Sequence, residues 1–243
     1  MLRAELIEQD DPRIGQEIIR VTHEDGRTED LHLHDYERVY ALPGVYEQIV
    51  QERLQCASPA RLAAILAAAV DGAGWPRSTV RVLDVAAGNG VSGEALVAEG
   101  LHPVLGTDIV ASARIAALRD RPGLYDRYLT LDLLALTAEQ ARPLYELDAN
   151  ALSCVAPVGE DASQVPPGVL LEAARLLGGD GLVAYLHDPN YGVDDVVTAE
   201  FWRTGLGAAA QELARERYLH RRTVNGAAFE MVGVVWRIRR GPQ

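Results

Sequence analysis

The segment from Gly88 to Gly93 carries the clearest chemical pattern in the sequence. It reads Gly-Asn-Gly-Val-Ser-Gly and matches G-x-G-x-x-G, in which glycines let a ligand approach the backbone closely. Asp108 follows Gly88 by 20 residues, a spacing at which an acid can hold the hydroxyls of a ribose. Taken alone, this pattern fits a dinucleotide, whose pyrophosphate lies at a helix N-terminus, or a nucleoside that carries an amino-acid tail.

Two further acids extend the pattern. Asp84 stands just before the glycines, where a carboxylate can meet the α-amine of an amino-acid tail. Asp132 follows the apolar run 127–131, the second run after the glycines. We expect Asp84, Asp108 and Asp132 at the ends of successive strands, where open sheets bind their ligands. The structural alternatives are a plain turn at the glycines, a helix cap at Asp108 and a loop acid at Asp132.

Strands and helices alternate through the region that must position these acids. Short apolar runs predict strands at 80–86, 102–108, 127–131, 147–156 and 182–186. Apolar spacing predicts helices at 58–70, 92–99, 112–119, 166–177 and 194–217. Ser58 followed by Pro59 is typical of a helix N-cap with proline at the first helical position. The alternation predicts a doubly wound α/β sheet.

Tight turns mark a hairpin at each end of the chain. Asp25-Gly26 lies between two alternating runs within 18–34, and Asn225-Gly226 separates the predicted strands 218–224 and 228–238. The second pair is antiparallel and belongs at the edge of the main sheet. We therefore expect an N-terminal hairpin and helical cap over residues 1–57, followed by the main domain over residues 58–243.

The run from Asp84 to Gly90, Asp-Val-Ala-Ala-Gly-Asn-Gly, resembles the first motif of class I S-adenosylmethionine-dependent methyltransferases of the small-molecule subgroup. Ala86 stands where that motif usually has its first glycine, and Asn89 where threonine is usual. The resemblance extends from Tyr36 to Arg239 and implies a seven-stranded Rossmann-like sheet with an antiparallel C-terminal hairpin. It also implies S-adenosyl-L-methionine as the cofactor. The residues that it assigns to the cofactor are Asp84, Ala86, Ala87, Gly88, Asn89, Gly90, Asp108, Ile109, Asp132, Leu133 and Tyr46.

Two histidines are candidates for proton transfer. A sulfonium-bound methyl is already electrophilic, so an enzyme of this class must mainly align the acceptor and needs a base only for some acceptors. His187 is followed by Asp188 at the end of the fifth predicted strand, and His34 lies beside the cap. A loop histidine without any role in proton transfer is the alternative.

Tyrosines and one acid are candidates for the substrate pocket. In similar methyltransferases an N-terminal helix that bears tyrosines covers the site, and Tyr36 and Tyr40 have the spacing of one helix face. Asp188, after the fifth strand, is the third candidate. The alternative for the tyrosines is packing in a helical core.

Composition excludes several kinds of chemistry and partner. The 23 basic side chains are all arginine, so the chain lacks the lysine required for a Schiff base, a P-loop or the Tyr/Lys pair of short-chain dehydrogenases. A net charge of −12 disfavours nucleic acid and anionic membranes as partners. Cys56 and Cys154 lie far apart and predict neither a disulfide framework nor a metal site.

The N-terminal residues lack a continuous apolar stretch, and the longest apolar run, 63–70, is too short to span a bilayer, so we expect a cytoplasmic protein. An exposed edge of the N-terminal hairpin predicts a homodimer as a further possibility.

Together these features predict a methyltransferase that moves a methyl group to an oxygen, nitrogen or carbon of a small molecule, such as a secondary metabolite. One alternative is an NAD(P)-dependent oxidoreductase, which Asp84, the C-terminal hairpin and the missing lysine disfavour. The other is a protein of the methyltransferase fold that binds the cofactor without transferring its methyl group.

Overall fold

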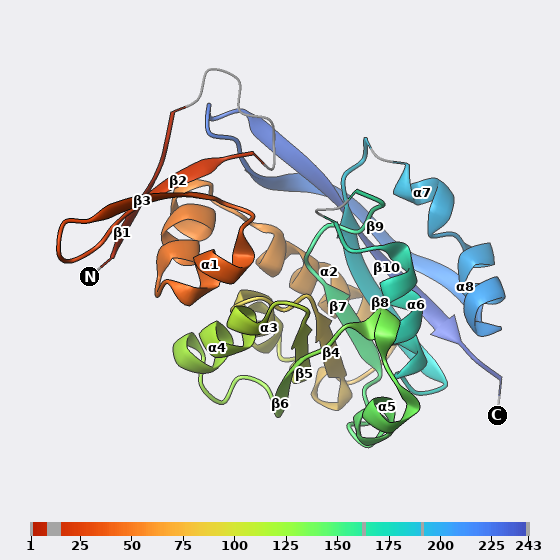
Figure 1. The fold of residues 1–243 in the computed structure, drawn as a ribbon. Coiled ribbons are helices and arrows are strands. Elements are labelled where there is room, and N and C mark those ends of the chain that lie inside the picture. Colours follow the sequence, from red (N-terminus) through yellow and green to blue (C-terminus); the bar gives the residue numbers. More distant parts are fainter. Residues whose placement is uncertain (1, 9–15, 162–163, 191, 242–243) are drawn as a thin grey trace.

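A seven-stranded sheet forms the centre of the protein in a computed structural model that describes residues 2–8, 16–161, 164–190 and 192–241 (Figure 1). The strands lie in the order β6-β5-β4-β7-β8-β10-β9. They are β4 (Arg81–Val85), β5 (His102–Asp108), β6 (Arg127–Thr130), β7 (Ala151–Cys154), β8 (Asp180–His187), β9 (Ala209–Arg222) and β10 (Ala228–Arg239). The first five are parallel, and β10 is antiparallel to both β8 and β9. This order confirms the predicted doubly wound sheet with a C-terminal hairpin.

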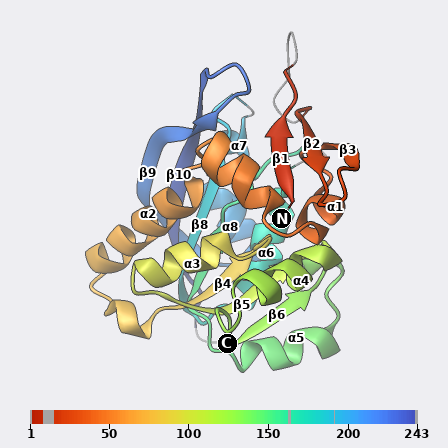
Figure 2. The same ribbon diagram turned by 90° about the vertical axis from the view of Figure 1, so that its left-hand side faces the viewer.

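Helices cover both faces of this sheet (Figures 1 and 2). Their bounds are α2 (Ser58–Gly72), α3 (Val91–Ala98), α4 (Ala111–Asp120), α5 (Ala138–Tyr145), α6 (Pro167–Arg175), α7 (Val193–Val196) and α8 (Ala199–Leu206), with short 3-10 helices η2 (Arg77–Thr79) and η3 (Leu133–Ala135). One buried apolar cluster joins α2 and α3 to the sheet, and a second joins α6 and α8 to its other face. From β4 the sheet grows toward β5 and β6 on one side and toward β7 and β8 on the other. The strand order therefore reverses at β4, and its carboxyl end is the switch point where such sheets bind ligands.

The N-terminal segment forms a second, smaller sheet with two helices. Its strands, β1 (Arg3–Leu6), β2 (Ile18–Thr22) and β3 (Thr28–His32), are antiparallel in the order β1-β2-β3. The β2–β3 pair confirms the hairpin at Asp25-Gly26, whereas β1 was not expected. Helix α1 (Tyr36–Ala41) packs on α4, as both views show (Figures 1 and 2). The π-helix η1 (Glu47–Arg53) follows, a rare form that often occurs at functional sites.

The helix predicted over residues 194–217 is confirmed only in its first half, where α7 and α8 lie, and is wrong for residues 209–217. Helix α8 ends at Gly207, whose φ of 63° is the left-handed conformation typical of a helix terminus, and the next residues form the long strand β9. Alanine, glutamate and arginine give this segment a helical propensity, but its pairing along β10 decides the structure. Strand β9 is at the sheet edge, which explains its many exposed charged residues.

The predicted N-cap at Ser58 is also wrong. Ala57 is the capping residue, and Ser58 is already inside α2. The buried Ser58 hydroxyl instead lies 2.6 Å from His220 Nδ1 and 3.0 Å from the Tyr218 hydroxyl, both on β9. The side chain therefore ties α2 to the edge strand, which removes it from the capping role.

Within the described residues no helix is long and apolar enough to cross a membrane, and no three metal-ligating side chains cluster. Cys56 and Cys154 are both free thiols.

Candidate cofactor and active site

The loop between β4 and α3 has an unusual backbone. Ala86, Gly88 and Gly90 all have positive φ, at 53°, 54° and 90°. Such angles are easy for glycine, while a Cβ in the left-handed region costs on the order of 1–2 kcal/mol. The loop thus needs the glycines for its path, and Ala86 carries strain at the position where the related motif has glycine.

Asp84 is fully buried beneath this loop. Its Oδ2 accepts hydrogen bonds from the Ser92 hydroxyl at 2.7 Å and from the Tyr125 hydroxyl at 2.8 Å. Among the described residues, Oδ1 has no hydrogen-bond partner. Burial raises the pKa of Asp84 to about 7, against the opposing effect of the two hydroxyl donors. The site therefore holds a carboxyl group with one oxygen ready for a donor.

Two tyrosines, Tyr125 in the loop between α4 and β6 and Tyr128 in β6, fill the space that glycines leave open. A Cβ added at Gly93 would lie 2.4 Å from the Tyr125 hydroxyl, and one at Gly106 would lie 2.7 Å from the ring of Tyr128. The Tyr128 hydroxyl donates to the Gly88 carbonyl at 2.6 Å. The third glycine of G-x-G-x-x-G is thus explained by Tyr125. Neither tyrosine was predicted to have a role, although the glycines at 93 and 106 were the available signal in the sequence.

Asp108, at the end of β5, is joined to the loop by a hydrogen bond. The Gly88 amide donates to its Oδ2 and the Val110 amide to its Oδ1, both at 2.9 Å. Burial raises the pKa of Asp108, although these backbone donors lower it. Each carboxylate oxygen keeps a second acceptor position. The next side chain, Ile109, is 69% exposed, an apolar surface left open beside an acid.

The end of β6 lies next to Asp108, since the Leu131 amide donates to the Asp108 carbonyl. Asp132 is exposed and its Oδ1 accepts from the Leu134 amide at 2.9 Å, so this carboxylate caps η3. Leu133 is buried, whereas Leu134 is exposed. The structure therefore brings Asp84, Asp108 and Asp132 together at the carboxyl ends of neighbouring strands, but it gives each a different environment.

Three tyrosines of the N-terminal segment stack over the glycine loop. The rings of Tyr36 and Tyr40 lie 5.5 Å apart and nearly parallel, and those of Tyr40 and Tyr46 lie 5.2 Å apart. A Cβ on Gly88 would lie 2.4 Å from the Tyr40 hydroxyl, so this hydroxyl touches the loop. The stack packs on small residues of α4. Burial raises the pKa of all three phenols, which makes them neutral hydroxyl groups at any physiological pH.

Polar contacts join the same segment to the loop. Glu47 Oε1 accepts from Asn89 Nδ2 at 2.6 Å and from Arg121 Nη1 at 3.1 Å. Arg121 also donates to the Asn89 carbonyl at 3.1 Å and to Glu94 at 2.9 Å. Arg121 belongs to no sequence motif, and its role was therefore not predicted.

The two candidate histidines lie in different surroundings. His187, at the end of β8, is buried; its Nδ1 lies 3.2 Å from the Asp188 carbonyl, and its Nε2 lies 3.0 Å from Asp194 Oδ1 without the geometry of a hydrogen bond. Asp188 accepts from the amide and side chain of Asn190. His34 packs edge-on against Tyr36, with its Nδ1 3.9 Å from Glu17 Oε2.

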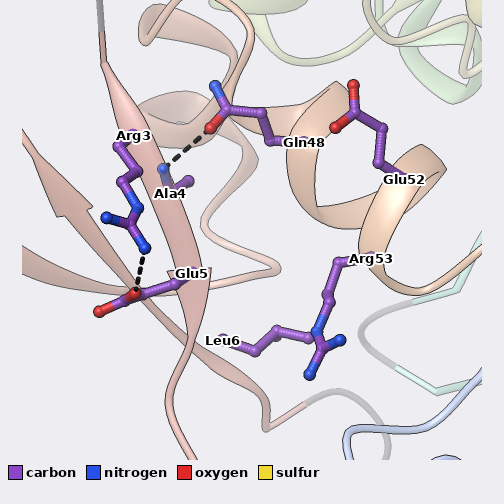
Figure 3. A pocket seen from close by; sticks show the side chains of 7 residues that line it. All are labelled: Arg3, Ala4, Glu5, Leu6, Gln48, Glu52 and Arg53. Carbon is purple, nitrogen blue, oxygen red and sulfur yellow. Dashed lines mark hydrogen bonds and ion pairs between the residues drawn. The ribbon is translucent and has the colours of Figure 1, made fainter.

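A surface hollow of about 550 Å³ lies away from these residues, between β1 and η1 (Figure 3). Its lining is Arg3, Ala4, Glu5, Leu6, Gln48, Glu52 and Arg53. The Gln48 side chain crosses it, accepting from the Ala4 amide at 3.0 Å and donating to the Leu2 carbonyl at 3.2 Å. The Gln48 side chain therefore already bonds backbone groups along the edge of β1. An additional strand would need these groups to pair with β1.

Comparison with known proteins gives structural but not sequence matches. No family model and no curated protein sequence matches the chain. An S-adenosylmethionine-dependent methyltransferase of Anabaena variabilis is similar in structure, with a TM-score of 0.52 and 16% identity over 87% of this chain and 96% of that one. A Pyrococcus horikoshii protein, provisionally described as an RNA methyltransferase, has a TM-score of 0.52 and 13% identity over 74% and 83% of the two chains.

A third similar structure spans nearly the whole length of both chains. It is the 1,6-didemethyltoxoflavin N1-methyltransferase of Burkholderia thailandensis, solved with 1,6-didemethyltoxoflavin and S-adenosylhomocysteine. Its TM-score is 0.51 and its identity 16%, over 96% of this chain and 99% of that one. Strand order, the C-terminal hairpin and these similarities agree. The chain has the fold of the class I S-adenosylmethionine-dependent methyltransferases.

Proposed function

We propose that this protein is an S-adenosylmethionine-dependent methyltransferase that acts on a small molecule. The observation that supports the proposal is that the glycine loop contacts two acids, Asp84 and Asp108, at the switch point of the sheet. Gly88 is hydrogen-bonded to Asp108, and Asp84 lies buried under the same loop. Open α/β sheets bind their ligands at such a switch point, outside the carboxyl ends of the strands.

The residues present fit the cofactor. The Asp84 oxygen without a partner is suited to the ammonium of the methionine part, since a buried acceptor is costly unless a donor reaches it. Asp108 retains acceptor positions for two ribose hydroxyls, and exposed Ile109 offers an apolar face to a purine. Asp132 and Leu133 would hold the adenine edge from the next strand. When bound, the cofactor supplies a methyl group that is already electrophilic.

The chain's own residues would position the acceptor and exclude water. Buried Tyr40, with partly buried Tyr36 and Tyr46, forms an apolar surface with neutral hydroxyl groups over the loop, in keeping with a site where a sulfonium must not meet water. For an acceptor that must lose a proton, His187 is the candidate general base. The Asp194 carboxylate lies next to its Nε2, and the main-chain carbonyl of Asp188 lies next to its Nδ1. His34 is the second candidate. Simple alignment without a base is the alternative.

A small molecule is the substrate class that two observations favour. The net charge of −12 opposes binding of polyanions such as RNA. The similar structure that covers 96% of this chain is a 1,6-didemethyltoxoflavin N1-methyltransferase, while the one described as an RNA methyltransferase covers 74%. Oxygen, nitrogen and carbon acceptors all remain compatible with this site.

A thermal-shift experiment tests the proposal. S-adenosylhomocysteine should raise the melting temperature of the protein, whereas NADH should leave it unchanged, because a ligand stabilises only the native state that binds it. Stabilisation by NADH alone would support the oxidoreductase alternative and refute the proposal. Binding without turnover on any panel of small acceptors would favour a protein of this fold that uses the cofactor for another purpose.

A further inference from the structure

Asp84 is a buried acid without a cationic partner. Its side chain is inaccessible to water, and its hydrogen-bond partners among the described residues are two neutral hydroxyl groups, those of Ser92 and Tyr125. In the described part of the chain no arginine or histidine bonds it, and the sequence contains no lysine. An isolated carboxylate in such a place is costly, so the neutral form of Asp84 is favoured.

The other titratable groups near Asp84 favour the same neutral form. Burial raises the pKa of Asp84 to about 7, and the negative charge of Asp108 on the neighbouring strand adds to this effect. The remaining neighbours are the phenols of Tyr125 and Tyr128 and the thiol of Cys154. Burial, followed by the charges of the two acids, raises the pKa of all three groups. They are therefore neutral at physiological pH, and none of them replaces a cation.

The proposed cofactor brings the cation that this acid lacks. The amino-acid part of S-adenosylmethionine has an ammonium group, and Asp84 Oδ1 has no hydrogen-bond partner among the described residues. An opposite charge at short distance favours the ionised form of a carboxyl group and lowers its pKa. The ligand-free protein and its complex should therefore differ by one proton at Asp84.

We propose that cofactor binding releases the proton of Asp84 to solvent, so that the ammonium is held by a carboxylate that forms only on binding. This inference rests on the proposed function. Protons then compete with the cofactor for one carboxyl group, and binding should weaken as the pH falls. Where Asp84 is fully protonated in the free protein, each further drop of one pH unit should weaken binding about tenfold, the limit for one proton.

Isothermal titration calorimetry of the full chain with S-adenosylhomocysteine tests the proposal. Titrations in buffers of different ionisation enthalpy give the number of protons released per ligand bound. We expect about one proton at pH 6 and fewer at pH 8, where much of Asp84 is already ionised. The control ligand is 5′-methylthioadenosine, which keeps the adenine and the ribose but lacks the ammonium. It should release no proton from Asp84, whereas a proton exchanged by Asp108 at the ribose would appear with both ligands.

Two variants identify the group that loses the proton. Asp84→Asn has no proton to release, so its affinity for S-adenosylhomocysteine should no longer depend on pH between 6 and 8. Tyr125→Phe keeps the ring beside Gly93 but removes a donor that favours the carboxylate. It should weaken binding of S-adenosylhomocysteine at pH 6 by about tenfold and leave that of 5′-methylthioadenosine unchanged. Tyr128→Phe, whose lost hydroxyl bonds the Gly88 carbonyl instead of Asp84, should keep the pH dependence of the unmodified protein.

Three results would overturn the proposal while leaving the cofactor assignment intact. They are binding of S-adenosylhomocysteine at pH 6 without proton release, equal proton release with both ligands, and release that persists in Asp84→Asn. If Asp84→Asn does not fold, an unchanged affinity of Tyr125→Phe at pH 6 would overturn it as well. Absence of S-adenosylhomocysteine binding at every pH would refute the proposed function itself, and the proton release with it.

Discussion

At the scale of single residues, Asp84 has the most unusual environment in the site. It is fully buried with two hydroxyl donors on one oxygen, and its pKa of about 7 lies above the ordinary value of 3.8. In the folded state the group therefore keeps its proton over a pH range in which the unfolded chain has lost it. Protonation of Asp84 favours the folded state below pH 4, and this contribution is lost as the pH rises toward 7.

Asp84→Asn should remove this pH dependence. The amide is neutral at every pH and close to the carboxyl in size. Relative to the unmodified protein, the variant should become more stable as the pH rises from 4 to 8, by a few kcal/mol at most. Urea unfolding of both proteins at pH 4, 6 and 8 would measure this difference in the free energy of unfolding. A constant difference between the two proteins would show that Asp84 does not titrate in this range.

Ala86→Gly should relieve backbone strain. Ala86 has a φ of 53°, at which a Cβ is unfavourable, so glycine is expected to stabilise the fold by up to about 1 kcal/mol despite its greater entropy when unfolded. Ala87→Gly is the matched control: Ala87 is buried and is not among the residues with positive φ, and its variant should lose about 1 kcal/mol. Chemical denaturation compares them. Equal losses would contradict the strain at Ala86.

At the scale of elements, Tyr125, in the loop between α4 and β6, holds α3 against the parallel strands. Tyr125 reaches past Gly93 of α3 to Asp84 of β4. The sequence predicted these elements well, with β5 at its observed bounds, because short buried strands and small-residue loops have local signatures. It could not predict that ring, glycine and acid meet, since that depends on packing between elements distant in the chain.

Gly93→Ala should therefore destabilise the protein by about 2 kcal/mol or more, because the new Cβ would displace the Tyr125 hydroxyl from Asp84. Gly168→Ala, also in a helix, is the control. Its Cβ would have only Leu134 at 3.5 Å, so the variant should be neutral or slightly more stable. Thermal unfolding measures both. A tolerated Gly93→Ala would mean that Tyr125 does not fix α3.

At the scale of the whole molecule, one buried ion pair joins the N-terminal segment to β9, the first strand of the C-terminal hairpin. Arg221 of β9 donates to Glu17, and both side chains are almost inaccessible to water. The Asn225-Gly226 turn predicted that the chain around residues 218–224 pairs with residues 228–238, but the helix predicted over residues 194–217 was wrong for residues 209–217. Composition favours a helix there, and the continued pairing of β9 along β10 makes these residues extended.

Arg221→Ala should lower the free energy of unfolding by about 3 kcal/mol, because it leaves the buried Glu17 carboxylate without this cation. Arg222→Ala removes an exposed neighbour on the same strand and should cost less than about 1 kcal/mol. Denaturation in guanidinium would compare the two variants, since salt screens a buried pair little. Equal effects would show that the Arg221 pair does not hold the two parts of the chain together.

Isothermal titration of the protein with S-adenosylhomocysteine, beside Asp108→Ala and with NADH as the competing ligand, tests the central claim most directly. The unmodified protein should bind one equivalent of S-adenosylhomocysteine and no NADH. Asp108→Ala should weaken binding by about tenfold or more, because the carboxylate joins the glycine loop to the ribose position. NADH binding in place of S-adenosylhomocysteine, or equal affinity in the variant, would contradict the assignment of this loop and acid to the cofactor.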